Sequence, residues 1–393
     1  MSRPDTIQPR TVRARKAIVR AVVRSAQPVA EPLVAIVLAL LVGAVGITMF
    51  SGLLAGHSSF DIGLPAAAYM ALLQGVASPN GFTSTLVYST PLILAGLGVG
   101  LGFKAGLFNI GGRGQFLFGT VGAMAVASTV GVTQSSYITI PLALLAGALF
   151  GAAAGFIPGF LKATSGAHEV VTTIMLNYVF VFVTYWAISG PLVLPNAHQP
   201  ITADVSDRNA ALPIILGRDG NAGILLALVA VPIIWFLLYR TTLGFEIRSA
   251  GANADAARYG GMKTNRLIVL TMSIAGLMAG LAGATTLLGV VHQIAPGYDT
   301  TVGFDAITVA LLGRSNPIGI LFSGLLLGAM RAGSQSMQIQ AGVPAELVDA
   351  LQAIILVFLV VNALRRWLDR RAAKRGSTPS VGAEVAGSAE GVA

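Results

Sequence analysis

Long apolar stretches separated by short polar breaks run along almost the whole chain. Several of them reach the roughly 20 residues that a helix needs to cross about 30 Å of hydrocarbon, and no ten-residue alternation suggests a β-barrel. The pattern therefore predicts an all-α, polytopic transmembrane bundle of about ten helices, some of them short or broken. The apolar stretches are residues 32–53, 84–103, 115–132, 138–161, 169–190, 222–239, 266–290, 303–314, 317–333 and 347–363.

Two segments near the N-terminus need separate interpretation. The stretch 32–53 follows a basic tail and is too long for the core of a signal peptide, so we expect a retained helix. Residues 65–79, PAAAYMALLQGVASP, are apolar but too short to span a membrane comfortably. We expect this second segment to be interfacial or re-entrant, and the sequence leaves both possibilities open.

The composition agrees with a membrane protein. The 393 residues are 54% hydrophobic and only 10% charged, whereas a soluble domain carries about 25% charged residues. The chain has no cysteine, which excludes disulfides, thiolate metal sites and cysteine nucleophiles.

The basic residues are distributed unevenly along the chain. If the N-terminus is cytoplasmic, 22 of the 25 Lys and Arg residues fall on cytoplasmic segments, and only Arg208, Arg218 and Arg331 lie outside or near the outer face. We therefore expect both termini to be cytoplasmic. The basic tail 1–31 and the basic, disorder-prone tail 364–393 then flank a transmembrane domain over 32–363, and their charge reports topology rather than nucleic-acid binding.

Motifs for nucleotide hydrolysis and metal binding are missing from the sequence. No G-x-x-x-x-G-K-[ST] phosphate loop occurs, and His168-Glu169 is not followed by a second histidine at zinc-motif spacing. We expect no catalytic residue, no cofactor and no metal site. Glycine pairs four apart, at 151/155 and 276/280, are more typical of close helix packing.

The predicted cytoplasmic loop, residues 240–266, is too patterned to be a simple connection. Asn253 is a suitable N-cap, Asp255 suits a first turn, and Gly260 or Gly261 can end a helix. These residues predict a short helix of about two turns. So short a helix is marginal alone, so the body of the protein or a partner should support it.

The segment GFEIRSAGANADAARYGGM in this loop resembles the coupling loop of the permease subunits of ABC importers, in the branch that handles simple sugars, nucleosides and branched-chain amino acids. In that family the loop contacts a separate ATPase subunit, which would explain the missing phosphate loop. The alternative is a solvated basic loop that serves only topology. The resemblance implies that the coupling residues of this loop are Gly244, Arg248, Gly251, Asn253, Ala256, Ala257, Arg258 and Gly260.

Three further motifs resemble the same family in the expected order. They are GLFNIGGRGQ (106–115), HEVVTTIMLNYV (168–179) and GFDAITVALLGRSNPIGILFSGLLLGAMRAG (303–333). Their pattern is similar to permeases for nucleosides and simple sugars, and TIMLNY favours nucleosides. The resemblance implies a type II-like ABC importer permease in the inner membrane. It also implies an ATPase subunit, an extracytoplasmic substrate-binding lipoprotein and a second permease subunit, which we expect to form a heterodimer with this chain.

The polar, glycine-rich break at 106–114 interrupts two apolar runs. Such a break is tolerated at membrane depth only where it is buried in protein or lines a wet cavity. Asn109 and Gln115 each offer donors and an acceptor, so they suit sugar hydroxyls or a base edge, and packing is the alternative. The charge distribution places Arg113 near the cytoplasmic surface, where it would anchor the fold or meet lipid phosphate.

Two other places offer polar side chains within apolar runs. Thr173 and Asn177 share a helix face and would line the solute pathway or hydrogen-bond between helices. Around Arg314, Ser315 and Asn316 an apolar region divides at Pro317 into pieces too short or barely long enough to span. Asp305 and Asn316 are therefore secondary pathway candidates, with a tight turn between packed helices as the alternative.

Rival functions remain open. Within the family, a ribose-type sugar permease or a branched-chain amino acid permease is possible, although no clear pair of charges for an amino acid is visible. A stand-alone secondary carrier would keep coupling carboxylates within its spans. The acidic residues near spans are few, namely Glu169, Asp305 and Asp349.

Overall fold

The computed structural model describes residues 34, 36–51 and 61–358, and most of them are helical. The chain divides into two compact units, one of residues 1–41 with 354–393 and one of residues 42–353. In the first unit the described residues, 34, 36–41 and 354–358, are helical. The two terminal tails expected from the sequence lie outside the described residues.

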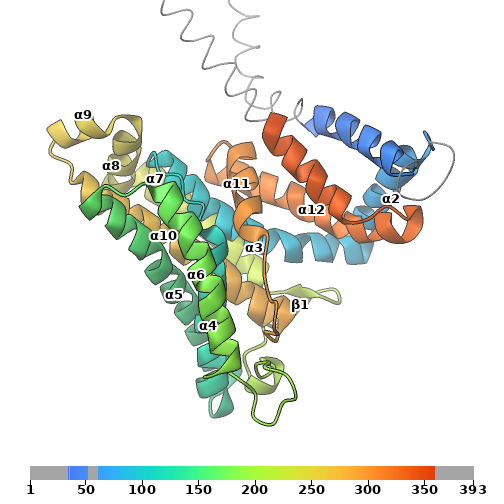
Figure 1. Ribbon diagram of the computed structural model, residues 1–393, viewed down its shortest axis with the longest axis horizontal. Coiled ribbons are helices and arrows are strands. Elements are labelled where there is room, and N and C mark those ends of the chain that lie inside the picture. Colours follow the sequence, from blue (N-terminus) through green and yellow to red (C-terminus); the bar gives the residue numbers. More distant parts are fainter. Residues whose placement is uncertain (1–33, 35, 52–60, 359–393) are drawn as a thin grey trace, which may run out of the picture. The chain divides into compact units, whose positions relative to one another are not determined.

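Among the described residues of the larger unit, seven helices are long and apolar enough to cross a membrane (Figure 1). They are α3 (Pro79–Lys104), α4 (Gly112–Thr129, continued by the 3-10 turn η1, Val130–Val132), α5 (Ser136–Ser165), α6 (Glu169–Ser189), α7 (Gly223–Arg240), α10 (Thr264–Thr286, continued by the π turn η3, Leu287–Val291) and α12 (Pro317–Ala341). Each matches an apolar stretch of the sequence, so the all-α, polytopic prediction is confirmed.

Shorter elements account for the remaining apolar stretches. Apolar helices also cover Ile36–Ser51, α2 (Leu64–Ala77) and α11 (Val302–Leu312), and residues 346–358 are helical. The larger unit also contains the 3-10 turn η2 (Ser206–Arg208) and a hairpin of β1 (Ile214–Leu216) and β2 (Gly220–Asn221).

The expected end of the last long helix was wrong. The apolar pattern stops at residue 333, but α12 continues to Ala341 and is followed by its C-cap, Gly342, whose φ is +65°. The final two turns are rich in serine and glutamine, which lower the hydropathy without preventing helix formation. The helix is therefore long enough to span, and Arg331 lies within it rather than near one end.

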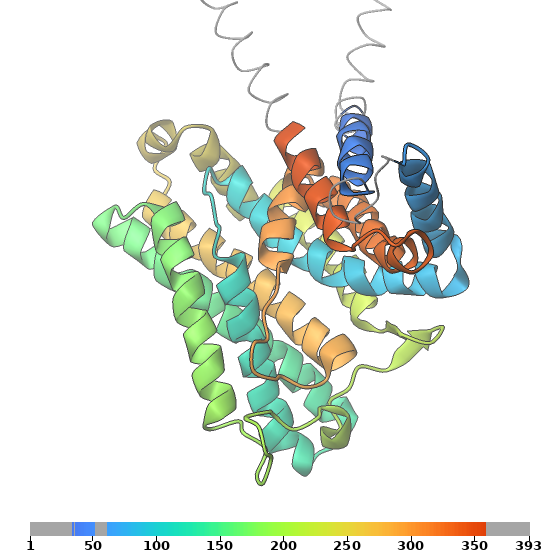
Figure 2. The same cartoon turned by 45° about the vertical axis from the view of Figure 1, so that its right-hand side comes forward.

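The central packing relies on small residues. Helix α10 packs along α5 and also contacts α3 and α4 (Figures 1 and 2). At the α5–α10 crossing, a Cβ atom on Gly151 would come within 2.3 Å of the carbonyl oxygen of Gly276. Only glycine fits there, which confirms the close packing expected of the paired glycines.

Helix α2 belongs to a second packing group with α3 and α12. Ser78 ends α2 and also caps α3, since its side chain accepts a hydrogen bond from the N–H of Gly81 at 3.0 Å. A Cβ atom on Gly333 of α12 would approach the carbonyl oxygen of Leu72 to 2.6 Å. Thus α2 is packed closely on α12, while its interfacial or re-entrant character stays a prediction.

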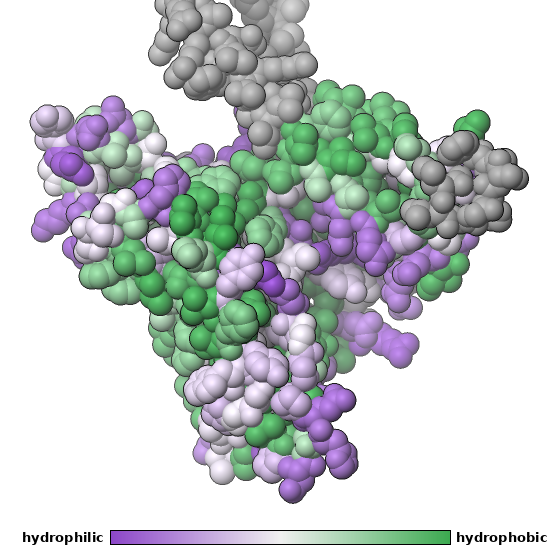
Figure 3. Space-filling model, in the orientation of Figure 1, coloured by the Kyte–Doolittle hydropathy of each residue, from purple (hydrophilic) through white to green (hydrophobic). Residues whose placement is uncertain are grey.

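The segment between α6 and α7 closes over the ends of several helices. Thr202 accepts a hydrogen bond from the backbone N–H of Ile294 at 3.0 Å, and Asn221 donates to the carbonyl oxygen of Gly289 at 2.9 Å. An extended segment, residues 292–301, then connects η3 to α11. Figure 3 shows apolar residues over much of the visible face, with polar residues around α8 and α9, right of the centre and at the lower end of the view.

Candidate functional site

The polar break between α3 and α4 is a non-helical stretch that buries Leu107, Asn109 and Gly111, while Gly106 and Phe108 are exposed. Gly106 turns the chain out of α3 with a φ of +72°, a conformation that favours glycine. The N–H of Leu107 closes the end of α3 by donating to the carbonyl oxygen of Gly102 at 2.9 Å. Helix α4 begins at Gly112, and its N-cap, Gly111, has no side chain to satisfy the first N–H groups.

Asn109 and Gln115 form a reciprocal pair of side-chain hydrogen bonds. The Nδ2 atom of Asn109 donates to Oε1 of Gln115 at 3.0 Å, and Nε2 of Gln115 donates to Oδ1 of Asn109 at 3.3 Å. Oδ1 of Asn109 also accepts from the N–H of Gly111 at 2.9 Å. Both side chains are about 2% exposed, so their polar atoms are directed at each other and at the backbone.

Helix α6 supplies the missing cap of α4. Oδ1 of Asn177 accepts from the N–H of Gly114 at 2.8 Å, and its Nδ2 donates to the carbonyl oxygen of Ile110 at 3.0 Å. Thr173, one turn earlier, donates to the carbonyl oxygen of Glu169 at 2.7 Å and lies 3.4 Å from the N–H of Ile110. The two share the buried face of α6, as the sequence predicts.

These four residues, Asn109, Gln115, Thr173 and Asn177, are called the α4 cap network below. In this structure Thr173 and Asn177 bond to the break and to α4, which is the interhelical alternative that the sequence left open. Asn109 and Gln115 bond to each other, which is the packing alternative. The role of all four in lining a solute pathway stays a prediction. They join the break to α6, so movement of one requires movement of the other or the loss of buried hydrogen bonds.

Arg113, next to the cap network, forms an ion pair with Asp299, a residue far from it in the sequence. Its guanidinium makes two contacts with the carboxylate of Asp299, one of them from Nε to Oδ1 at 2.7 Å and the other from Nη2 to Oδ2. The side chains are 23% and 49% exposed. Arg113 therefore anchors the extended segment 292–301 to the start of α4. The sequence suggested a fold anchor but not this partner.

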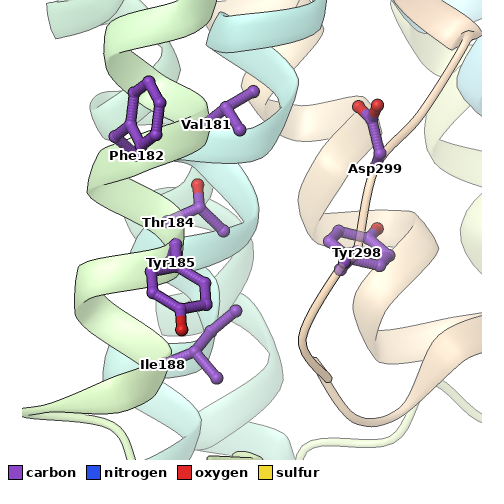
Figure 4. Close-up of a pocket in the computed structure, with 8 residues that line it drawn as sticks. Val181, Phe182, Thr184, Tyr185, Ile188, Tyr298 and Asp299 are labelled. Atoms are coloured by element: carbon purple, nitrogen blue, oxygen red, sulfur yellow. The ribbon is translucent and has the colours of Figure 1, made fainter.

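A cavity of about 380 Å³ lies beside this ion pair, between α6 and the extended segment (Figure 4). Phe182 and Tyr185 of α6 lie on one side, and Tyr298 and Asp299 on the other. Burial raises the pKa of Tyr298 to about 12. The hydroxyl is thus protonated at neutral pH. The remaining lining residues are Val181, Thr184, Ile188 and Gly297.

Asp305 and Asn316 lie apart from this cluster. The carboxylate of Asp305, at the start of α11, accepts hydrogen bonds from Nη2 of Arg331 and from Oγ1 of Thr301, both at 2.8 Å. Asn316 is exposed and caps α12, since Oδ1 accepts from the N–H of Ile318 at 3.0 Å. The structure therefore shows the tight-turn alternative at Asn316, while the pathway role of both residues stays a prediction.

The loop at 240–266 contains two helices. Helix α8 (Thr242–Ala252) was not expected, because Gly244 and Gly251 weaken the helical pattern, although Thr241 caps it by accepting from Gly244 N–H at 3.1 Å. Helix α9 (Ala254–Tyr259) confirms the short helix that the sequence predicts. Its N-cap is Asn253, which accepts from the N–H groups of residues 255 and 256 at 3.0 Å.

The predicted docking residues fall into supporting and exposed sets. Gly244 and Ala257 are buried, and the guanidinium carbon of Arg248 lies 5.0 Å from the Tyr239 ring centre. A Cβ atom on Gly251 would come within 2.1 Å of the carbonyl oxygen of Lys104, so α8 contacts the start of the α3–α4 break. Asn253, Ala256, Arg258 and Gly260 are exposed.

Sequence reasoning missed Asp299, Tyr185 and Tyr298. Asp299 is 186 positions from Arg113, so no local pattern connects them. The one available signal was an arginine within a polar break of a predicted membrane domain, since a charge at such a place generally has a partner. The two tyrosines were read as part of apolar stretches or connections.

Comparison with known proteins identifies the family. Residues 81–360 match the family model described as branched-chain amino acid transport system / permease component. The guanosine ABC transporter permease protein NupP of Bacillus subtilis is 38% identical over 88% of this chain and 97% of its own length. The glucose ABC transporter permease protein TsgB13 of Haloferax volcanii is 34% identical over 76% of this chain and 81% of its own length.

A more distant relative comes from the same bacterium as the first. The guanosine ABC transporter permease protein NupQ of Bacillus subtilis is 26% identical over 62% of this chain and 78% of its own length. The matched region and the 38% relative together place this chain in the branched-chain amino acid transport system / permease component family. It is a multi-pass membrane protein and the permease component of an ABC transporter, not its ATPase.

Proposed function

We propose that this chain is a nucleoside importer permease of the inner membrane. The observation that carries the proposal is the 38% identity to a guanosine permease over 88% of the chain. In this proposal such a permease uses three parts described above: the docking loop (residues 240–266), the α4 cap network and the cavity beside α6. An extracytoplasmic binding lipoprotein delivers the solute, and a separate ATPase supplies the energy.

A sugar permease is the second candidate, favoured by the 34% identity to a glucose permease. The lining of the cavity, which has aromatic rings as well as a carboxylate, supports the nucleoside. Rings on two sides provide stacking surfaces for a planar base, while the carboxylate can accept from the hydroxyl groups of either solute.

The ATPase docks on residues 243–262 in this proposal. Tyr259 is 94% exposed at the end of α9, and exposed aromatic side chains are typical anchors of protein interfaces. A polar cavity of about 370 Å³ lies beside it, between α8 and the start of α10. Thr242, Glu246, Lys263 and Arg266 line this cavity and can receive polar groups of a partner.

A continuous series of contacts links the docking loop to the cavity. Helix α8 touches the start of the break at Gly251 and Gly106, the break is bonded to α6 by the α4 cap network, and Arg113 holds Asp299. Movement of α8 that follows ATPase motion would therefore reach α6 and the extended segment. Such contiguity supports coupling but does not replace a coupling measurement.

The partner permease is a different chain in this proposal, which makes the assembly a heterodimer. The support is the occurrence of two guanosine permease proteins, NupP and NupQ, in one bacterium, both similar to this chain.

Both termini are cytoplasmic in the proposed topology, as the basic residues indicate. A reporter fused after Ala363 should give a cytoplasmic signal, and an outside signal would reverse the orientation.

The first experiment is co-purification of the chain with the products of neighbouring genes, followed by reconstitution in proteoliposomes. We expect an ATPase, a second permease and a binding protein, and ATP-dependent uptake of nucleosides but not of glucose or leucine. Uptake of glucose alone would select the sugar permease. Solute movement by this chain without ATP would contradict the proposal altogether.

Docking is tested by charge reversal on α9. Arg258→Glu should reduce recovery of the ATPase with the permease, because Arg258 is exposed on the proposed docking surface. The control is Arg218→Glu, an equal charge change in the exposed β1–β2 turn. Equal ATPase recovery and uptake for the two variants would count against the docking assignment.

A further inference from the structure

The cavity between α6 and residues 297–299 combines aromatic rings with a carboxylate in its lining. Its walls carry the rings of Phe182, Tyr185 and Tyr298, and its rim carries the carboxylate of Asp299 (Figure 4). Its volume, about 380 Å³, lies within the range of about 300–1,000 Å³ typical of small-molecule pockets. Size and lining together therefore fit a small organic solute.

The aromatic side chains are available for contact. Phe182 and Tyr185 are 71% and 55% exposed, and their spacing of three residues puts them on one face of α6. Tyr298 lies opposite them, on the segment 292–301. Rings on two sides of a cavity provide stacking surfaces for a planar heteroaromatic group.

The carboxylate supplies hydrogen-bond acceptors without a net charge. Asp299 is paired with the guanidinium of Arg113, so the pair as a whole is neutral. Oδ1 of Asp299 also accepts from the N–H of Thr300 at 2.7 Å, and the Asp299 side chain is still 49% exposed, so a ligand can approach it. An ionised carboxylate accepts hydrogen bonds and donates none, so it selects hydroxyl or N–H groups of a neutral ligand.

We propose that this cavity holds the solute within the permease, with the heteroaromatic base of a nucleoside stacked on Tyr185 and Tyr298 and the ribose hydroxyls donating to Asp299. This inference rests on the proposed nucleoside function and adds the site at which this chain itself contacts the solute. Tyr185, Tyr298 and Asp299 are then specificity residues, and Arg113 positions the carboxylate.

The direct test is photolabelling with 8-azidoguanosine. The sample is the detergent-solubilised complex of both permeases and the ATPase, with the binding protein left out. We expect label on peptides that contain residues 181–188 or 297–299, and protection by excess guanosine but not by 2′,3′-dideoxyguanosine. Tyr185→Leu should lower the labelling about tenfold, as expected for loss of a stacking contact. Label confined to other peptides, or label that guanosine does not displace, would overturn the inference.

The matched control is Tyr178→Leu. Tyr178 lies two helical turns before Tyr185 on α6, is 61% exposed and does not line the cavity. This variant should be labelled like the unmodified complex. Equal loss in both tyrosine variants would show a general effect on α6 or on an interface, and would contradict a specific role for Tyr185.

Exchanging the charges of Arg113 and Asp299 separates two roles of Asp299, namely accepting hydrogen bonds from the solute and pairing with Arg113. Arg113→Asp combined with Asp299→Arg preserves an ion pair but replaces the acceptor at residue 299 with a donor. We expect the exchanged complex to assemble and to lose the preference for guanosine over its dideoxy analogue. Retention of that preference would show that Asp299 is only an anchor.

Uptake by the unmodified complex distinguishes this inference from the proposed function. If proteoliposomes take up guanosine while the label maps elsewhere, the cavity assignment fails and the nucleoside function stands. If they take up no nucleoside, the proposed function fails and the cavity assignment fails with it. Guanosine uptake together with protected label at α6 supports both.

Discussion

Helices α4 and α12 start in similar sequence contexts but are capped in different ways. Each follows a polar break that contains glycine, asparagine and arginine, FNIGGRG at 108–114 and GRSNP at 313–317. The first N–H groups of α12 are served by Asn316, which directly precedes the helix. Those of α4 are served in part by Asn177 of α6, 63 residues further along the chain.

The difference separates a local turn from a long-range connection. Arg314 and Ser315 adopt positive φ angles and the turn closes on itself, with Ser315 N–H bonded to the carbonyl oxygen of Ala310 at 2.7 Å. The α3–α4 break instead makes its side-chain bonds to α6 and to the extended segment. A polar break that is satisfied by distant side chains can transmit movement, whereas a turn held by its own backbone hydrogen bonds mainly redirects the chain.

The strongest challenge to this comparison is Asn177→Leu. It would leave the N–H of Gly114 and the carbonyl oxygen of Ile110 without their hydrogen bonds inside the protein. Each buried polar group left unpaired costs about 1–3 kcal/mol, so we expect a large drop in the thermal unfolding midpoint and loss of uptake. Unfolding in detergent and uptake in proteoliposomes measure the two effects.

Comparing the loss of folded protein with the loss of uptake shows which role Asn177 has. Asn177→Ser, which retains a polar group but cannot span the same distance, should fall between leucine and the original residue. If uptake declines only as far as the amount of folded protein does, Asn177 acts in helix packing alone. A greater decline in uptake supports a role in transmission or in the pathway.

The second prediction concerns the contact between α8 and the break. Gly251→Leu places a side chain where a Cβ atom already lies 2.1 Å from the carbonyl oxygen of Lys104, so the backbone must move apart. We expect ATP hydrolysis by the complex to continue while uptake falls about tenfold or more, because a small displacement of backbone can disable a coupled step. Paired hydrolysis and uptake assays measure this uncoupling.

The control is Ala252→Leu, an increase in side-chain size at the next, exposed position of α8. This variant should keep both activities. If Gly251→Leu behaves in the same way, the contact between α8 and the break is not part of coupling, and the break resembles the α11–α12 turn more than the structure suggests.

A third prediction uses the ion pair of α11 and α12. Arg331→Gln leaves Asp305 with Thr301 as its remaining close partner, and both ionic side chains are largely buried, at 23% and 18% exposure. We expect a loss of about 1–3 kcal/mol in unfolding free energy. The double variant Arg331→Gln with Asp305→Asn should be milder, because it removes the uncompensated charge.

Thermal unfolding of the single and double variants measures this difference. A double variant as unstable as the single one would show that the two charges do not stabilise each other. The test also sharpens the main comparison, since Arg331 ties α12 to α11 beyond their connecting turn, as Asn177 ties α6 to α4.

The sequence predicted the features that depend on local patterns. The long helices follow from apolar length, and α9 follows from Asn253 and its alanines. The cap of α4 and the partner of Arg113 could not be found in this way, because they join residues 63 and 186 positions apart. Thr173 and Asn177 were recognised as a polar helix face, but the sequence could not tell which atoms that face would meet.

The smallest expected effect concerns the turn between α11 and α12, where the helix cap is local. Asn316→Ala removes one exposed N-cap hydrogen bond from α12, and loss of such a cap costs about 0.5–2 kcal/mol. We expect a slightly lower unfolding midpoint and unchanged guanosine uptake, with Asn316→Asp as a control that retains the cap. A loss of uptake in the alanine variant without a matching loss of stability would return Asn316 to the set of pathway residues and remove the distinction between the two breaks.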